Sequence, residues 1–125
     1  MKKKSAPIIK ISEAQIQKGI LEYLLYRPNI AFVRHNAIKM FGGKGKPTPI
    51  KLKSWELGVA DIIVCYRGRY IEFEVKTPRT KQSDNQIIRQ ETVEKAGGFY
   101  FVIRSIKDVE TALREINDKV TNEKI

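Results

Sequence analysis

Two carboxylates and a lysine occupy the strands of a predicted β-hairpin, where their types and spacing can support hydrolysis. Asp61 begins an apolar strand over residues 61–66, and Glu74 and Lys76 lie near the end of the returning strand over residues 69–76. Glu74 and Lys76 are two residues apart, so their side chains share one face of the sheet. The three groups therefore converge only if the turn brings Asp61 to that same face.

The length of the turn decides which residue faces Asp61. If Arg67-Gly68 is a two-residue turn, Asp61 lies opposite Glu74 and their Cβ atoms are about 5 Å apart. A three-residue turn puts Asp61 opposite Val75, on the wrong face unless a bulge intervenes. The two-residue turn is the reading that makes a site.

Two carboxylates this close repel each other, so one is protonated or a cation lies between them. A hard divalent cation fits oxygen ligands, and Mg²⁺ or Mn²⁺ suits two carboxylates with water and phosphate. Lys76 can hold a water there and oppose the charge that builds on a phosphate. The opposing interpretation is a solvated strand face, because Glu-x-Lys alone is common.

A first helix is expected to bring a further carboxylate to this site. Ser12 followed by Gln15 has the spacing of a capping box, and the helix extends to about residue 26, before Arg27-Pro28. Glu13 falls on the apolar stripe of this helix, which directs a carboxylate inward near the helix start. The stripe consists of Ile16, Ile20, Leu21 and Leu24.

The remaining elements complete an α/β fold of order αβ(loop)ββαβα, a mixed sheet flanked by helices. Residues 30–35 form a strand, and residues 36–56, with glycine, proline and lysine, form a long loop. Ser83 and Gln86 cap a second helix that Gly97-Gly98 ends. Residues 99–103 form an apolar strand, expected to be central. Ser105 caps a last helix with the stripe Ile106, Val109, Leu113, Ile116 and Val120.

The net charge of +10 lies in two short stretches. Residues 1–10 contain four lysines and no acid, within a basic arm over residues 1–11, and residues 34–53 contain six bases and no acid. The rest of the chain is balanced, so the concentrated charge favours a polyanion as partner. The expected nucleic-acid contacts are Arg34, Lys39, Lys44, Lys46, Lys51 and Lys53; a solvated loop is the alternative.

Composition excludes several classes of site. His35 is the only histidine, which rules out a Cys/His zinc site and any two-histidine metal centre. Cys65 is the only cysteine and is expected to be a small buried residue. Gly45-Lys46 lacks the spacing of a phosphate-binding loop. No apolar run spans a bilayer or forms a signal peptide, so the chain is expected to be cytoplasmic.

The order of motifs resembles the virus-type replication-repair nuclease (VRR-Nuc) family of the PD-(D/E)xK nucleases. Gly58-Val59-Ala60-Asp61-Ile62-Ile63-Val64 is followed by Glu74-Val75-Lys76, with Ala60 in place of the proline that the superfamily name contains. The wider pattern includes Ser12–Gln17, Arg34-His35-Asn36, Ser83–Gln86 and Ala96–Val102. The resemblance covers residues 12–115 of one nuclease domain, 12–125, with a restriction-endonuclease-like core.

This resemblance implies metal-dependent hydrolysis of phosphodiester bonds. Asp61, Glu74 and the backbone carbonyl of Val75 would bind the metal, and Lys76 would position the water or stabilise the transition state. Glu13 would complete the acidic cluster directly or through water. Gln86, from the second helix, would also contribute while capping that helix.

Small family members of this kind resemble Holliday-junction resolvases, which act on branched DNA as homodimers. The chain is therefore expected to be a structure-selective DNA endonuclease. A homodimer suits a four-way junction, since two symmetric cuts need two active sites. A flap or duplex nuclease of the same fold is one alternative, and a non-cleaving nucleic-acid-binding module is another.

Four further residues have open interpretations. Glu72 shares the face of Glu74 and is expected to be a surface or supporting charge. His35 is either structural or a substrate contact, and the chemistry does not need it as a base. Phe41 and Trp55 flank the basic loop, where they either stack on bases or pack in the core.

Overall fold

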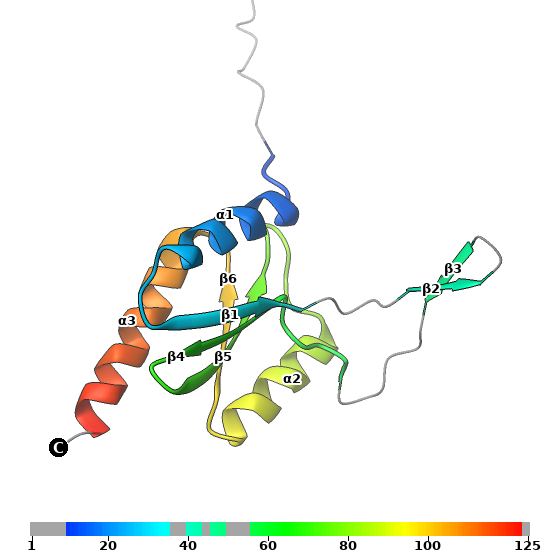
Figure 1. Cartoon of the computed structure of the whole chain (residues 1–125). Helices are drawn as coiled ribbons and strands as arrows, with labels where there is room; N and C mark the ends of the chain where they lie inside the picture. The colour runs from blue at the N-terminus through cyan, green and yellow to red at the C-terminus, as the bar shows by residue number, and fades with distance from the viewer. Residues whose placement is uncertain (1–9, 36–39, 44–45, 50–55, 124–125) are drawn as a thin grey trace, which may run out of the picture.

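The structure is a computed structural model that describes residues 10–35, 40–43, 46–49 and 56–123 (Figure 1). Its elements follow the predicted order, with one addition. They are α1 (Glu13–Leu25), β1 (Ile30–Arg34), β2 (Met40–Gly43), β3 (Lys46–Pro49), β4 (Ile62–Tyr66), β5 (Arg69–Val75), α2 (Asp84–Lys95), β6 (Phe99–Ile103) and α3 (Ile106–Glu123).

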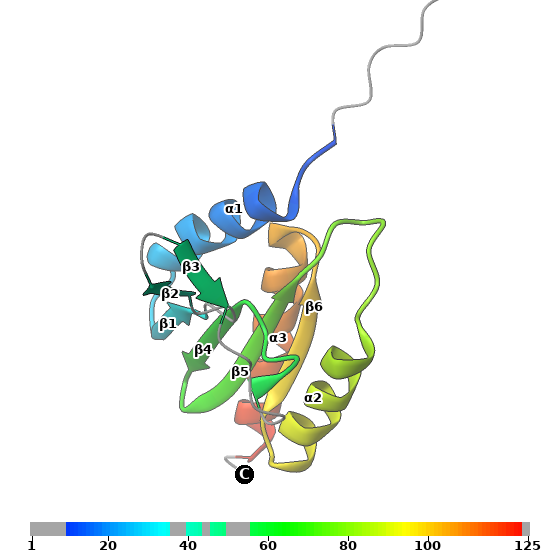
Figure 2. The ribbon, with the colours of Figure 1, turned by 90° about the vertical axis from the view of Figure 1, so that its right-hand side faces the viewer.

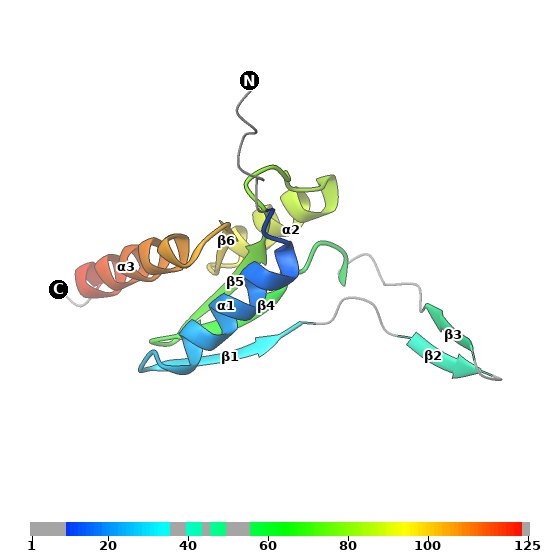
Figure 3. The same cartoon turned by 90° about the horizontal axis from the view of Figure 1, so that it is seen from above.

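A four-stranded mixed sheet of order β1-β4-β5-β6 organises the molecule. The pairs β1–β4 and β4–β5 are antiparallel, and β5–β6 is parallel because α2 makes the crossover between them. Helices α1 and α3 cover one face of the sheet and α2 covers part of the other; in Figure 3, α3 and α2 extend on either side of β6. The fold class is the α/β arrangement that the sequence predicts.

The main core lies between the sheet and helices α1 and α3. Alternate residues of β4 and β5 point into it, among them Ile62, Val64, Ile71 and Phe73, all at most 1% exposed. A smaller cluster of Ala60, Val93 and Tyr100 lies under α2. The opposite side chains of β5 therefore face α2, which places Glu72 and Glu74 in a buried layer.

The helix boundaries agree with their capping signals. Ser12 and Gln15 form a full capping box at α1, and Ser83 and Gln86 form another at α2. The backbone N–H of Asp108 donates to the Ser105 hydroxyl at the start of α3. Figure 2 shows the three helices packed around the sheet, with the start of α1 beside the segment that follows β5.

Four predictions about the fold are wrong. Residues 36–56 are not simply a loop, because β2 and β3 pair as an antiparallel hairpin inside them. Strand β6 is an edge strand, and it is apolar because α2 and α3 both contact it. Cys65 is exposed on the part of the sheet that α2 leaves open, and Ile106 is 41% exposed at the first position of α3.

The basic arm lies mostly outside the described residues, of which Lys10 and Ile11 belong to it and are exposed. Among the helices that the structure describes, none combines the length and the hydropathy that crossing a membrane requires.

Candidate active site

A two-residue turn sets the register that brings the two carboxylates together. Tyr66 pairs with Arg69 across Arg67-Gly68, both of which have positive φ, as a tight hairpin turn requires. Counted from the turn, Ile62 is the last residue of β4 that pairs with β5, and it lies opposite Phe73. The next residues outward are Asp61 and Glu74, so the two-residue reading is confirmed and the three-residue reading is wrong.

The backbone of the hairpin orients Asp61 at this position. The backbone N–H of Val75 donates to Oδ2 of Asp61 at 2.9 Å. On the other side, the Asp61 carbonyl accepts from the backbone N–H of His35 at 2.7 Å, just beyond β1. Asp61 is therefore fixed between the two neighbouring strands, while its side chain stays partly exposed.

Glu74 is 4% exposed, and besides Asp61 the side chains of Gln86 and Lys76 lie close to its carboxylate. The Gln86 side-chain amide donates to its Oε1 at 2.7 Å, and the Lys76 ammonium lies 3.9 Å from the same oxygen. Gln86 also accepts from the backbone N–H of Ser83 through its own Oε1. One side chain thus caps α2, as the sequence predicts, and contacts Glu74.

This environment disfavours the charged form of Glu74. Burial and then the neighbouring Asp61 carboxylate raise the pKa of Glu74 to about 8, against the smaller opposing effect of Lys76. Glu74 therefore tends to keep its proton near neutral pH when no cation compensates the charge of its neighbour. A hard cation with oxygen ligands relieves the same repulsion, so the donor set fits Mg²⁺ or Mn²⁺.

Glu13 lies near this pair but is exposed at the start of α1, so the carboxylate is less inward than its place on the stripe indicates. It accepts from the Thr80 hydroxyl at 3.3 Å and adds to the rise in the pKa of Glu74. In the described part of the chain, no three acidic, histidine or cysteine side chains lie close enough together to hold one metal ion.

Glu72 is neither a surface charge nor free of partners. It is fully buried, and its carboxylate accepts from the Arg89 guanidinium at 2.6 Å, the Tyr70 hydroxyl at 2.6 Å and the Ala60 backbone N–H at 3.1 Å. Burial raises the pKa of Glu72, but these hydrogen bonds outweigh it and lower the pKa overall. Arg89 and Tyr70 were missed, although the face that Glu72 shares with Glu74 would have indicated burial under α2.

Gly58 brings the start of α2 against the loop that leads into the site. It has a φ of 79°, and a Cβ atom there would lie 2.2 Å from the Asn85 carbonyl oxygen. The Tyr100 hydroxyl donates to the Gly58 carbonyl at 3.3 Å. Only glycine fits this contact, which sets the distance between Gln86 and the strand that Asp61 begins.

The predicted nucleic-acid contacts are only partly within the described residues. Arg34 is exposed at the end of β1. Lys39, Lys44, Lys51, Lys53 and Trp55 lie outside the described residues, and Lys46 and Phe41 belong to β3 and β2 with their backbones alone described. The basic surface beside the site thus stays a prediction.

The comparisons with known proteins bear on the fold. No protein-family model matches the sequence, and a search of curated proteins finds no relative. Among solved structures, a chain described as a VRR_NUC domain matches with a TM-score of 0.55 and 23% identity, over 82% of this chain and 94% of that one. The chain therefore has the fold of a VRR_NUC domain, as the motif order predicts.

Proposed function

We propose that this protein is a divalent-metal-dependent DNA endonuclease of the VRR-Nuc type that cuts branched DNA. The observation that carries the proposal is the convergence of Asp61, Glu74 and Lys76 at one end of the β4–β5 hairpin, within the fold of a VRR_NUC domain. Two carboxylates can bind a divalent metal ion and a lysine can oppose charge on a phosphate, so these groups can support hydrolysis of a phosphodiester without a second histidine.

Asp61 and Glu74 are the proposed metal ligands, with the Val75 carbonyl as a third. Mg²⁺ or Mn²⁺ bound there supplies a Lewis acid that favours hydroxide over water and neutralises charge on the phosphate. Glu13 would act through water, because it is exposed beside the pair rather than joined to it.

Lys76 and Gln86 position the reacting groups. The Lys76 ammonium, beside Glu74, can hold the attacking water by a hydrogen bond and oppose the negative charge that grows on the phosphate. Gln86 fixes the Glu74 carboxylate through its amide, while the start of α2 fixes Gln86. The orientations of Glu74 and Gln86 therefore depend on the packing of α2 on the sheet.

Branched DNA is the proposed substrate class, and a homodimer the proposed assembly. Paired cuts in a four-way junction need two active sites, so two copies related by symmetry would each supply the pair Asp61 and Glu74. The basic stretch over residues 34–53 would bind phosphates without reading sequence.

A substrate panel tests the proposal. Labelled four-way junction, flap and linear duplex are incubated with the protein in Mg²⁺ and in EDTA. Metal-dependent, symmetric nicks in the junction are expected. Preferential cutting of the flap or the duplex would replace the substrate assignment, and a bound but intact junction under all conditions would identify a binding module instead.

A further inference from the structure

A cleft of about 440 Å³ opens beside the candidate active site. It lies between the residues that lead into α1 and the segment that follows β5. Its apolar lining consists of Ile11, Ile16 and Pro78, and its charged lining consists of Lys10, Arg79 and Arg104. None of the described residues that line the cleft belongs to the basic stretch over residues 34–53, so its cations are additional to that stretch.

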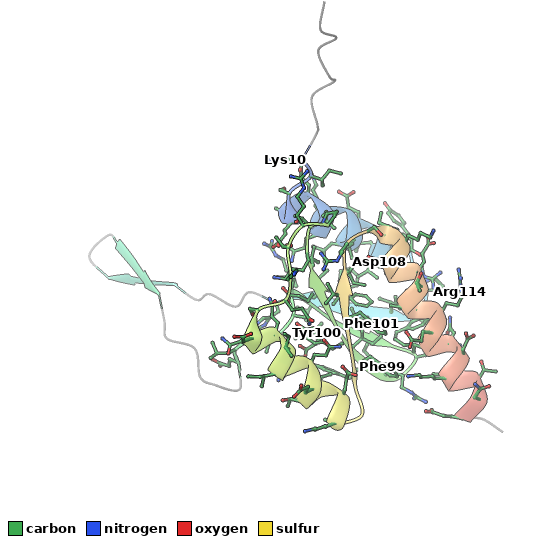
Figure 4. The ribbon with its side chains drawn as sticks, turned by 180° about the vertical axis from the view of Figure 1, so that it is seen from behind. Lys10, Phe99, Tyr100, Phe101, Asp108 and Arg114 are labelled. Carbon is green, nitrogen blue, oxygen red and sulfur yellow. The ribbon has the colours of Figure 1, made fainter. Side chains whose placement is uncertain are left out.

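The lining of the cleft is cationic. Among the described residues that line it, three are lysine or arginine and none is an acid. Two acids near the residues of the cleft have hydrogen-bond partners of their own: Glu13 accepts from the Thr80 hydroxyl, and Asp108 accepts from the Arg104 backbone N–H at 2.9 Å. Lys10 and Arg79 are exposed (Figure 4 shows Lys10 at the N-terminal end of α1), so their charges are available to an anion.

The cleft is physically joined to the active site. Thr77, which lines it, directly follows Lys76. Arg104 donates to the carbonyl oxygens of Thr77 and Thr80, the second at 2.7 Å, and so fixes the turn between the two sites. A nucleotide next to a phosphate at Lys76 is therefore within reach of the cleft.

The volume and the mixed lining match a nucleotide. Small-molecule sites have volumes of about 300–1,000 Å³ and combine apolar walls with a few polar groups, whereas one phosphate needs only cations. The three apolar side chains can cover a nucleobase. The three cationic side chains can contact the phosphates on either side of that nucleotide. A base in duplex DNA is stacked and paired, so only an unpaired one can enter.

We propose that this cleft binds one unpaired nucleotide of the DNA strand next to the scissile phosphate. This inference rests on the proposed nuclease function and specifies its substrate: DNA with an unpaired nucleotide at the cut, as at a branch or a flap. Selection for branched DNA then comes partly from this cleft and not only from the basic stretch over residues 34–53.

Equilibrium binding of labelled DNA in EDTA tests the inference. The full chain is titrated against a single-stranded oligonucleotide and against the blunt duplex of the same sequence, from about 50 to about 200 mM salt. The variants are Lys10→Ala/Arg79→Ala and Ile11→Ser. The control Lys95→Ala/Arg114→Ala removes the same charge from exposed positions at the end of α2 and on α3.

The charge variant is expected to bind single strands about tenfold more weakly than wild type, with a salt slope reduced by about 1.4, or 0.7 for each of two phosphates. The control should change both far less. Ile11→Ser should weaken single-strand binding about threefold and leave duplex binding unchanged, because Ile11 is 57% exposed and its loss does not disturb the core.

Two results overturn the inference. If the charge variant behaves as the control does, the cleft contacts no phosphate. If the charge variant weakens both DNA forms equally and Ile11→Ser has no effect, the surface follows the backbone and takes no base. Cleavage by the wild type is measured on the same DNA with Mg²⁺, so a failure of the nuclease proposal is seen separately.

Discussion

At the scale of single residues, Glu74 is the carboxylate whose charged form the fold disfavours. It is almost fully buried next to a second carboxylate, and its pKa is raised from 4.5 to about 8. The folded protein therefore binds a proton at Glu74 more tightly than the unfolded chain does. The resulting stabilisation is fully present below pH 4.5 and is lost as the pH rises towards 8.

We therefore predict that the metal-free wild type loses stability over this pH window, relative to Glu74→Gln. The difference is at most about 5 kcal/mol, because one pKa unit corresponds to about 1.4 kcal/mol. Urea unfolding of both proteins in EDTA at several pH values measures it. Parallel stability curves for the two proteins between pH 4.5 and 8 would show that Glu74 is ionised throughout.

Glu72 is a carboxylate of the opposite kind, held in its charged form. Its ion pair with Arg89 is shielded from water on the Glu72 side, where the exposed fraction is 0%. Removing Arg89 leaves a buried charge with weaker compensation, which is costly. The pair supports the site indirectly, because it fixes α2 to the same strand that carries Glu74.

Arg89→Ala is therefore expected to lower the free energy of unfolding by about 3 kcal/mol at neutral pH. Arg114→Ala, on the exposed side of α3, should change it by less than about 0.5 kcal/mol. Thermal or urea unfolding gives both values. If Arg89→Ala is as mild as the control, the Tyr70 hydroxyl and the Ala60 N–H suffice to hold Glu72.

At the scale of elements, the position of α2 depends on one backbone contact. Gly58 has a positive φ and touches the Asn85 carbonyl, whereas Gly68, with φ 81°, has open space where a Cβ atom would lie. The two glycines have nearly the same φ, and only at Gly58 would a Cβ atom meet another part of the chain. They are a matched pair for measuring what the contact contributes.

We predict that Gly58→Ala lowers the free energy of unfolding by about 2 kcal/mol or more, because the loop and α2 must separate. Gly68→Ala should cost only about 1 kcal/mol, the strain of a left-handed alanine. Gly58→Ala should also reduce cleavage through the displacement of Gln86. Equal losses of stability in the two variants would mean that the loop moves freely from α2.

The sequence predicts elements well where a local signal exists. The capping boxes at Ser12 and Ser83, and a tight turn at Arg67-Gly68, depend on neighbouring residues, so the sequence predicts them. The hairpin register depends on the turn length, for which the sequence leaves two alternatives open. The edge position of β6 depends on strand order, which no local pattern records. Cys65 is exposed for a related reason: α2 covers only part of the sheet, and the apolar run around Cys65 does not reveal it.

The candidate site shows the same division. The alternation of Glu72, Glu74 and Lys76 follows from the chain itself. The family resemblance implies that Gln86 contributes to the site, but neither its contact with Glu74 nor the pairing of Glu72 with Arg89 was predicted. That pair joins residues 17 apart, and only the packing of α2 on the sheet determines it.

At the scale of the whole molecule, the positive charge and the acidic pair occupy different parts of the chain. All of the net charge lies in residues 1–10 and 34–53, while Asp61 and Glu74 lie in the balanced remainder. A carboxylate pair repels a phosphate backbone, so the basic stretches are the parts that can hold DNA over it. The cleft beside α1 contains two further cations that lie outside these stretches, Arg79 and Arg104.

Neutralising Lys44, Lys46, Lys51 and Lys53 together is expected to weaken binding to every DNA substrate. The salt dependence should flatten by up to about 0.9 log units of slope for each lost phosphate contact on duplex DNA. Binding of labelled duplex across a salt series measures it, with Lys95→Ala/Arg114→Ala as the control. An unchanged slope would mean that this stretch is only a solvated surface.

The central claim is that Asp61, Glu74 and Lys76 act together on a phosphodiester. The most direct test is single-turnover cleavage of a labelled four-way junction in Mg²⁺ by the wild type and by Asp61→Ala, Glu74→Ala and Lys76→Ala, with binding measured in EDTA. We expect cleavage to be at least about a hundredfold slower in each variant, with junction binding retained. Cleavage by Asp61→Ala at the wild-type rate would contradict it.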